Sequence, residues 1–249
     1  MSRRFFVREI SPHSSSIRIT GDEFHHLVHV VRFSIGDTIQ LISSNGVAEG
    51  VIQDILHDAA IVVIKSYLPS VETSYVIHLL QGLPKIKKMD DIIEKGTEVG
   101  IRSFHPVIMK RSYSSLSAEQ LKEKTNRWNR IACAATKQSG ASTIPYVHDV
   151  HALRSRIQSM DVGPHDILLV ADEAEKERNL FQVLPTTIPK KVPNNIWICI
   201  GPEGGITEEE MGFLGTKGFQ PVTLGRTILR TETAGYFMAG LVQYIMEFL

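Results

Sequence analysis

Two glycine-bearing segments near the C-terminus have the residue types and spacing of ligand-binding loops. The first, Gly201-Pro202-Glu203-Gly204-Gly205, follows the apolar run Ile196–Ile200 and precedes Thr207. Glycines let the backbone approach a ligand closely and adopt conformations that other residues avoid. The segment has neither the GxxxxGK[ST] pattern of a phosphate cradle nor the GxGxxG pattern, so it indicates no nucleoside triphosphate or NAD site. Taken alone, it is also compatible with a simple tight turn.

The second segment, Val222–Ala234, runs from the end of another apolar stretch into the expected final helix. A carboxylate in a first helical turn is stabilised by the helix dipole, so Glu232 has a structural explanation. Arg230 has none, because a cation in front of a helix N-terminus is locally unfavourable. We therefore expect Arg230 to bind an anion, a polar base edge or Glu232.

Other chemistries find little support in the sequence. His25, His26 and His29 resemble metal ligands in spacing, but no Cys or carboxylate follows at a fixed distance, so no metal is expected. There is no G-x-S-x-G elbow and no Ser/His/Asp order, which argues against nucleophilic hydrolysis. Cys133 and Cys199 lack CxxC spacing and are predicted to be reduced, packed thiols.

The elements that must position these loops fall into two groups along the chain. In the first seventy residues, short alternating segments predict a small, mostly antiparallel β-barrel. One helix interrupts it, which starts near Gly21-Asp22, where Asp22 can cap, and runs through Val31. The predicted strands are Arg4–Arg8, Ile17–Ile19, Thr38–Ile42, Val47–Ile52 and Ala60–Lys65.

After a polar linker at Pro69–Ser74, compact apolar strands alternate with longer helical patterns. This alternation predicts a mainly parallel sheet covered on both faces, an α/β domain whose ligands bind beyond the carboxyl ends of strands. Reciprocal capping is expected at Ser117 with Gln120 and at Thr207 with Glu210. The expected strands are Val76–Leu80, Phe104–Met109, Ile167–Ala171, Ile196–Ile200 and Pro221–Leu224, and the expected helices are Met89–Val99, Ser117–Gln138, Thr207–Lys217 and Thr231–Phe248.

Composition and charge bound the class of protein. The 249 residues are 43% hydrophobic and 22% charged with a net charge of zero, as in an ordinary globular protein. Residues 85–137 are a basic stretch with a net charge of +6, which suits a phosphate backbone but equally a solvated helix face. The N-terminus returns to charge before a signal-peptide core forms, and no apolar run spans a bilayer, so a cytoplasmic protein without a membrane partner is expected.

Several segments match one family in both order and spacing: Arg4–Val7, His25–Leu27, Lys95–Gly100, Gln138–Gly140, Gly201–Gly205, Leu224–Arg226 and Ile228–Ala234. Together they closely resemble the RsmE family of bacterial 16S ribosomal RNA uridine-N3 methyltransferases, which belong to the SPOUT superfamily. The resemblance covers nearly the whole chain. It implies a PUA-like β-barrel RNA-binding domain at residues 1–70 and, at residues 74–249, a SPOUT methyltransferase domain whose parallel sheet ends in a trefoil knot.

The resemblance further implies S-adenosylmethionine as cofactor, 16S rRNA of the small ribosomal subunit as substrate, and a homodimer. An apolar stripe on the last helix, at Phe237, Leu241, Val242, Ile245 and Phe248, fits either a dimer contact or the chain's own core. The residues expected to bind the cofactor are Ile200, Gly201, Pro202, Gly205, Leu224, Gly225, Leu229, Thr233 and Ala234.

The same resemblance assigns catalytic and RNA-binding roles. Arg230 would stabilise negative charge on the uracil oxygens after N3 loses its proton, while Glu232 would accept that proton or orient Arg230. The chain departs from the family pattern at Ile86-Lys87 and at Ala141, which follows Gly140 where the family usually has arginine; Lys137 or Arg111 would compensate. The residues expected to contact RNA are Arg4, His25, Arg32, Lys88, Arg111 and Lys137.

Three alternatives to base methylation stay open at this stage. The first keeps the fold and cofactor but methylates a ribose 2′-hydroxyl, and the second is a non-catalytic RNA-binding or ribosome-assembly factor. Retention of Arg230 and Glu232 favours an enzyme over the second alternative. The third, a metal-dependent hydrolase built on the histidine cluster, would require an activity that a chelator abolishes.

Overall fold

The computed structural model describes residues 4–7, 10, 15–43, 46–68, 75–113, 116–139, 141, 143–184 and 195–248. It divides into two compact units, residues 1–72 with 136–144 (unit 1) and residues 73–135 with 145–249 (unit 2). The predicted linker at 69–74, the turn residues Ser44 and Asn45, and Gly140 lie outside the described residues.

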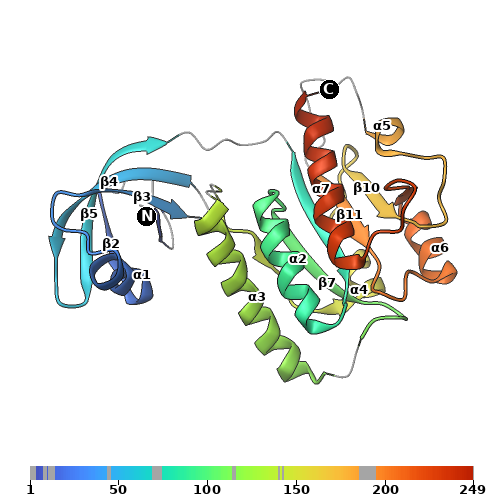
Figure 1. Cartoon of the computed structure of the whole chain (residues 1–249), viewed down its shortest axis with the longest axis horizontal. Coiled ribbons are helices and arrows are strands. Elements are labelled where there is room, and N and C mark those ends of the chain that lie inside the picture. Colours follow the sequence, from blue (N-terminus) through green and yellow to red (C-terminus); the bar gives the residue numbers. More distant parts are fainter. Residues whose placement is uncertain are drawn as a thin grey trace. The chain divides into compact units, whose positions relative to one another are not determined.

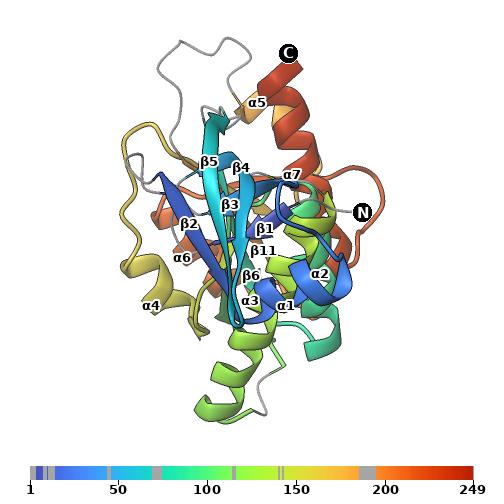
Figure 2. The ribbon, with the colours of Figure 1, turned by 90° about the vertical axis from the view of Figure 1, so that its left-hand side faces the viewer.

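Unit 1 contains a five-stranded sheet in the order β1-β3-β4-β5-β2 (Figure 2). β1 runs parallel to β3 and the other neighbours are antiparallel. Alternate residues such as Leu41 and Val62 point into one apolar core with Phe5, as expected for a half-barrel with one covered face. The strands are β1 (Arg4–Phe6), β2 (Ser16–Thr20), β3 (Thr38–Ser43), β4 (Gly46–Ile55) and β5 (Ala59–Leu68).

The helix of unit 1 begins where the sequence predicted, near Gly21, but a different residue caps it. It consists of α1 (Gly21–His25) and η1, a π-helical turn over His26–Val30. The prediction that Asp22 caps this helix is wrong: Thr20 is the N-cap residue and Asp22 lies in the first turn. Gly21, the first residue of the helix, has a φ of +62°, a conformation that a residue with a side chain rarely adopts.

Unit 2 contains a second sheet, in which every pair of neighbouring strands is parallel. The order is β12-β10-β11-β6-β7-β8, and β9 also pairs with β7. The predicted parallel α/β architecture is therefore confirmed. The strands are β6 (Val76–Gly82), β7 (Ser103–Ile108), β8 (Tyr146–Val147), β9 (His151–Ala152), β10 (Ile167–Ala171), β11 (Asn195–Ile200) and β12 (Gln220–Val222).

Helices cover both faces of this sheet (Figure 1). Leu79 and Ile198 pack with residues of α2, α3 and α7 in one core, whereas their neighbours Leu80 and Cys199 pack with residues of α4 and α6 in another. Strands buried on both faces explain the continuous apolar runs in the sequence. The helices are α2 (Ile86–Glu98), α3 (Ala118–Ser139), α4 (Leu153–Gln158), α5 (Leu180–Val183), α6 (Glu208–Thr216) and α7 (Thr231–Phe248).

Both predicted capping boxes are present. The Ser117 N–H donates to Gln120 Oε1 at 2.9 Å and the Gln120 N–H donates to Ser117 Oγ at 3.3 Å. Thr207 and Glu210 make the same pair of bonds at 3.0 and 3.3 Å, so α6 begins directly after the first glycine loop. Within the described residues, no helix is long and apolar enough to cross a membrane.

Candidate functional site

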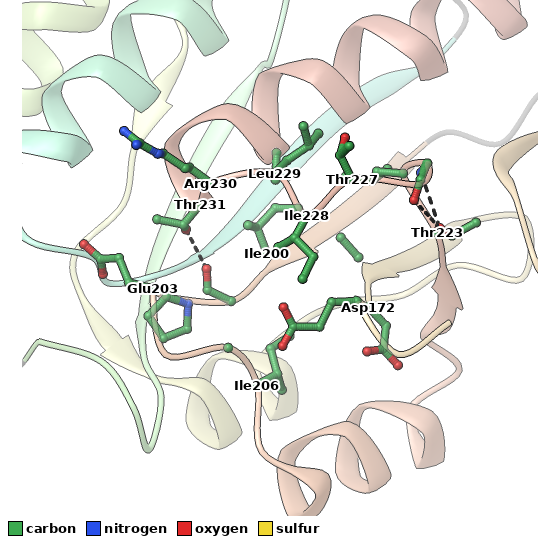
Figure 3. Close-up of a pocket in the computed structure, with 18 of the residues that line it drawn as sticks. Asp172, Ile200, Glu203, Ile206, Thr223, Thr227, Ile228, Leu229, Arg230 and Thr231 are labelled. Atoms are coloured by element: carbon green, nitrogen blue, oxygen red, sulfur yellow. Dashed lines mark hydrogen bonds between the residues drawn. The ribbon is translucent and has the colours of Figure 1, made fainter. Parts of the chain in front are cut away.

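A cavity of about 420 Å³ lies beyond the carboxyl ends of the neighbouring strands β10, β11 and β12 in unit 2 (Figure 3). Its walls come mainly from the last residues of these strands and the segments that follow them, including the two predicted glycine loops, together with Lys88 of α2. This is the edge where open parallel sheets bind ligands. Eight of the nine residues predicted to bind the cofactor line the cavity: Ile200, Gly201, Pro202, Gly205, Leu224, Gly225, Leu229 and Ala234.

The first glycine loop is tightly folded after β11. A Cβ atom added to Gly201 would lie 2.8 Å from Ile206 Cγ1, closer than real side chains allow. Gly205 has a φ of +75°, and its N–H donates to the Pro202 carbonyl at 2.9 Å. Arg111, predicted to contact RNA, donates instead to the Gly204 carbonyl at 2.8 Å. The loop therefore presents backbone to the cavity because side chains are excluded from it.

The second glycine loop follows β12 and forms the opposite wall. Gly225 has a φ of +124°, a region that favours glycine, and its N–H donates to Thr223 Oγ1 at 3.3 Å. Ile228 is 75% exposed although it lines the cavity, and Figure 3 shows it facing the same space as Ile200 and Ile206. The cavity thus combines apolar side chains with exposed backbone, as small-molecule sites do.

Arg230 stands at the rim of this cavity and is exposed. No hydrogen bond or ion pair joins its guanidinium to another residue in the part of the chain that the structure describes. Its backbone carbonyl accepts the N–H groups of Thr233 and Ala234 and so closes the first turn of α7. Thr233, the ninth predicted cofactor residue, does not line the cavity.

Glu232 makes an ion pair with a residue that the sequence assigned to RNA. Lys88 Nζ lies 3.0 Å from Glu232 Oε2 and 3.3 Å from Glu203 Oε1, so one ammonium group bridges two carboxylates. Partial burial acts to raise the pKa of Glu232, but its own backbone N–H, Lys88 and Arg230 together lower that pKa below its ordinary value. Glu232 is therefore an ionised carboxylate beside the rim.

Several residues at the cavity were not predicted. Asp172 and Glu173 follow β10 and line the cavity; the Asp172 carboxylate accepts the N–H of Ala174 at 2.9 Å. Their position directly after a predicted strand could have identified these two residues, because parallel strands end at a common edge of the sheet. Thr231 also lines the cavity; it lay within the Ile228–Ala234 motif but had been given no role. Gln81, which donates to Thr231 at 2.9 Å, lay in no motif.

The other residues predicted to contact RNA lie in unit 1. Arg4 Nε donates to Gln40 Oε1 at 3.1 Å, and Lys137 forms an ion pair with Glu23. His25 and Arg32 are exposed, and Arg32 has a φ of +62°, which is unusual for a residue with a side chain. These four residues belong to unit 1, whereas Lys88 and Arg111 belong to unit 2.

The three histidines of α1 and η1 do not form a common cluster. The His26 ring lies 5.9 Å from that of Phe5, a core residue, while His25 and His29 are exposed with their rings 4.9 Å apart. Among the described residues, no group of three or more His, Cys, Asp or Glu side chains is arranged to hold a metal ion.

The apolar stripe on α7 divides between two environments. Val242 and Ile245 are buried in the core of unit 2, and Leu241 packs partly against it. Phe237 and Phe248 are 40% and 70% exposed. Only the second pair leaves apolar surface for another molecule.

Two known domain families match this chain. Residues 71–243 match the RNA methyltransferase domain family and residues 19–65 match the RNA methyltransferase PUA domain family. These two matches define the class as an RNA methyltransferase with an appended PUA domain. The chain is 33% identical to ribosomal RNA small subunit methyltransferase E of Bacillus subtilis over 255 residues, covering 99% of this chain and 98% of the relative. The chain belongs to the ribosomal RNA small subunit methyltransferase E family, which confirms the resemblance noted in the sequence.

Solved structures agree with this assignment. A ribosomal RNA small subunit methyltransferase E from Neisseria gonorrhoeae, bound to S-adenosylmethionine, is 25% identical, with a TM-score of 0.84 and 98% of both chains covered. A putative methyltransferase from Legionella pneumophila has a TM-score of 0.80 at 24% identity over 98% of this chain and 97% of its own, which shows the shared fold.

Proposed function

We propose that this protein transfers a methyl group from S-adenosylmethionine to N3 of a uridine in the 16S rRNA of the small ribosomal subunit. The observation that carries the proposal is the meeting of two glycine loops, from the ends of β11 and β12, at one cavity with Arg230 at its rim. Support comes from membership of a family named for small-subunit rRNA methylation and from the cofactor bound to the Neisseria relative.

The cavity suits S-adenosylmethionine in shape and chemistry. Its volume of about 420 Å³ falls within the usual range for small-molecule sites. Gly201 has no room for a side chain against Ile206, so its backbone would lie directly against the ligand. Leu224 and Leu229 would pack on the apolar parts of the cofactor. When bound, the cofactor supplies an electrophilic methyl group on its sulfonium; the protein's task is to align N3 with that carbon.

Arg230 and Glu232 are the proposed catalytic residues. N3 of uracil is a poor nucleophile until its proton leaves, and the negative charge then spreads onto the base oxygens. The Arg230 guanidinium, which no residue in the described part of the chain engages through a hydrogen bond or an ion pair, would stabilise that charge. Glu232 is ionised beside Lys88 and would accept the proton, directly or through water.

RNA binding is assigned to both units. The target base must leave its stack to reach the cavity, so additional contacts along the RNA are needed to hold the strand. Unit 1 would supply Arg4, His25, Arg32 and Lys137, and unit 2 would supply Lys88 and Arg111. We propose residues 1–70 and 74–249 as the limits of the two domains, and the cytoplasm as the site of action.

We also propose that the enzyme is a homodimer. Phe237 and Phe248 leave apolar side chains exposed along α7, and a second copy would remove them from water. Sedimentation velocity of the full chain should give the mass of two copies; a monomer at micromolar concentration would refute this part of the proposal.

The function is tested by methyl transfer to purified small subunits. Subunits lacking their native uridine-N3 methylation are incubated with labelled S-adenosylmethionine, and the recovered RNA is digested to nucleosides. Labelled 3-methyluridine is expected, with native, methylated subunits as the matched control that takes up no label. Label in a 2′-O-methyl nucleoside would identify the ribose as acceptor. Cofactor binding without transfer to either acceptor would leave a non-catalytic RNA-binding factor.

A further inference from the structure

A buried amide and a buried hydroxyl connect the first glycine loop to the start of α7. Gln81, near the end of β6, and Thr231, the first residue of α7, are 150 positions apart in sequence. Gln81 Nε2 donates to Thr231 Oγ1 at 2.9 Å. Thr231 Oγ1 in turn donates to the Gly201 carbonyl at 2.6 Å (Figure 3). Gln81 Nε2 also donates to the Gly82 carbonyl at 3.0 Å, so the amide is fixed by its own strand.

The stability of the folded state does not explain why a glutamine occupies position 81. Gln81 is completely buried, and within the described residues its Oε1 atom has no hydrogen-bond partner. A buried amide oxygen without a partner disfavours the folded state. A methionine has a similar length and would place no such atom in the core. The amide is better explained by what its Nε2 atom holds in place.

The loop that receives these bonds is confined from two other sides. A Cβ atom on Gly82 would lie 2.6 Å from Pro202 Cδ, and one on Gly201 would lie 2.8 Å from Ile206 Cγ1. Because this packing already fixes the loop, the two hydrogen bonds mainly fix Thr231 relative to it. Thr231 stands between Arg230 and Glu232, so any shift of Thr231 moves both.

We propose that Gln81 and Thr231 are positioning residues, which hold the turn carrying Arg230 and Glu232 at a set position against the Gly201 loop. The inference rests on the proposed function. A misplacement of about 1 Å away from the chemistry can slow a reaction by roughly 100-fold. Loss of the Gln81–Thr231–Gly201 hydrogen-bond relay should therefore slow methyl transfer strongly. It should change the affinity for the cofactor much less, because the packing of the loop preserves the cofactor site.

The test separates these two quantities. Cofactor affinity is measured by calorimetry, and single-turnover methyl transfer is measured at saturating S-adenosylmethionine. Thr231→Val should slow transfer by about 10- to 100-fold while the dissociation constant changes less than about threefold, and Thr231→Ser, which restores a hydroxyl, should recover most of the rate. Thr97→Val is the matched control, since Thr97 is also buried and donates to a backbone carbonyl, that of Ile93, at 2.7 Å. It should leave the rate unchanged.

Gln81→Met keeps the proposal testable if a Thr231 variant folds poorly. It should slow transfer while thermal unfolding stays close to wild type, because it removes a buried unpartnered oxygen together with the donated bonds. The double variant Gln81→Met/Thr231→Val should be no slower than the slower single variant, since both break one relay.

Three results would overturn the inference: a wild-type rate in Thr231→Val, a Thr231→Ser variant as slow as Thr231→Val, or losses that simply multiply in the double variant. Measurements on the wild type distinguish failure of the proposed function from failure of the positioning role alone. If the wild-type protein binds no S-adenosylmethionine, the proposed function fails and the positioning role with it. If the wild type transfers methyl groups and Thr231→Val does so equally fast, only the positioning role fails.

Discussion

Acidification is expected to destabilise unit 2 through one buried histidine, His105 on β7. Its side chain is almost completely buried, and its Nε2 atom lies 2.7 Å from Ser103 Oγ. The ring stacks on that of His148, with centroids 4.1 Å apart, and lies 5.0 Å from the ring of Trp197. Its Nδ1 atom is buried without a hydrogen-bond partner in the described structure, so a proton there would be neither hydrated nor paired.

The pKa values give the direction and size of the effect. Burial, followed by the charges of His148, Arg156 and His78, lowers the pKa of His105 from 6.5 to about 2. The unfolded chain therefore binds a proton below pH 6.5 that the folded chain does not, and stability falls as the pH falls from 6.5 towards 2. Each full pH unit is worth at most about 1.4 kcal/mol, and at pH 6.5 the unfolded histidine is only half protonated, so His105 alone removes about 2 kcal/mol between pH 6.5 and 4.5. Burial also lowers the pKa of His148, to about 4, which acts in the same direction.

The assay compares urea unfolding of wild type and His105→Phe at pH 7.5, 6.5, 5.5 and 4.5. Phenylalanine keeps a ring against His148 and Trp197 but cannot take up a proton. Between pH 6.5 and 4.5, wild type should lose about 2 kcal/mol more stability than the variant. His165→Gln, a substitution of an exposed histidine in the same unit, should follow wild type. Parallel stability curves for wild type and His105→Phe would refute the reasoning, because the acid sensitivity would then come from other groups.

Three further predictions concern the cavity. Arg230→Ala should lower methyl transfer at least about 100-fold without changing thermal unfolding or the dimer, and unchanged turnover would remove Arg230 from the mechanism. Gly201→Val should abolish cofactor binding measured by calorimetry, because its Cβ would lie 2.8 Å from Ile206 Cγ1; wild-type affinity would show that the cofactor lies elsewhere. Lys88→Met removes a cation that lowers the pKa of Glu232, so the acidic limb of the pH–rate profile should move to higher pH, and an unmoved limb would exclude Glu232 as the titrating base.

Much of the fold was predictable because long elements carry their own signals. The apolar run Ile196–Ile200 falls within β11, and the Ser117 and Thr207 capping boxes mark the starts of α3 and α6. β8 and β9 are only two residues long, too short to show a period of any kind. Their pairing with β7 depends on contacts between distant parts of the chain, which composition and spacing do not encode.

Only part of the candidate site was predictable from the sequence. Gly201 and Gly225 could be singled out because each follows a recognisable apolar strand, and both line the cavity. Gln81 could not be singled out, because one polar residue within a buried strand has no recognisable pattern around it. Its distant partners, the Gly201 carbonyl and the Thr231 hydroxyl, lie 120 and 150 positions away. Thr233 was selected as part of a motif, yet the turn of α7 places it outside the lining.

The arrangement of charge at the start of α7 explains why Arg230 is available to a substrate. The sequence suggested that Arg230 binds an anion, a polar base edge or Glu232, since a cation in front of a helix N-terminus is unfavourable. Glu232 is instead engaged by Lys88 at 3.0 Å, and the turn is anchored by the Thr231 hydroxyl on the Gly201 carbonyl. The charge of Arg230 helps to lower the pKa of Glu232, but within the described residues neither the fold of the turn nor an ion pair with Glu232 engages the guanidinium. The positive charge of Arg230 therefore remains at the rim of the cavity, close to the N-terminus of α7, where it is unfavourable. A negative charge formed on a bound base would offset this unfavourable interaction.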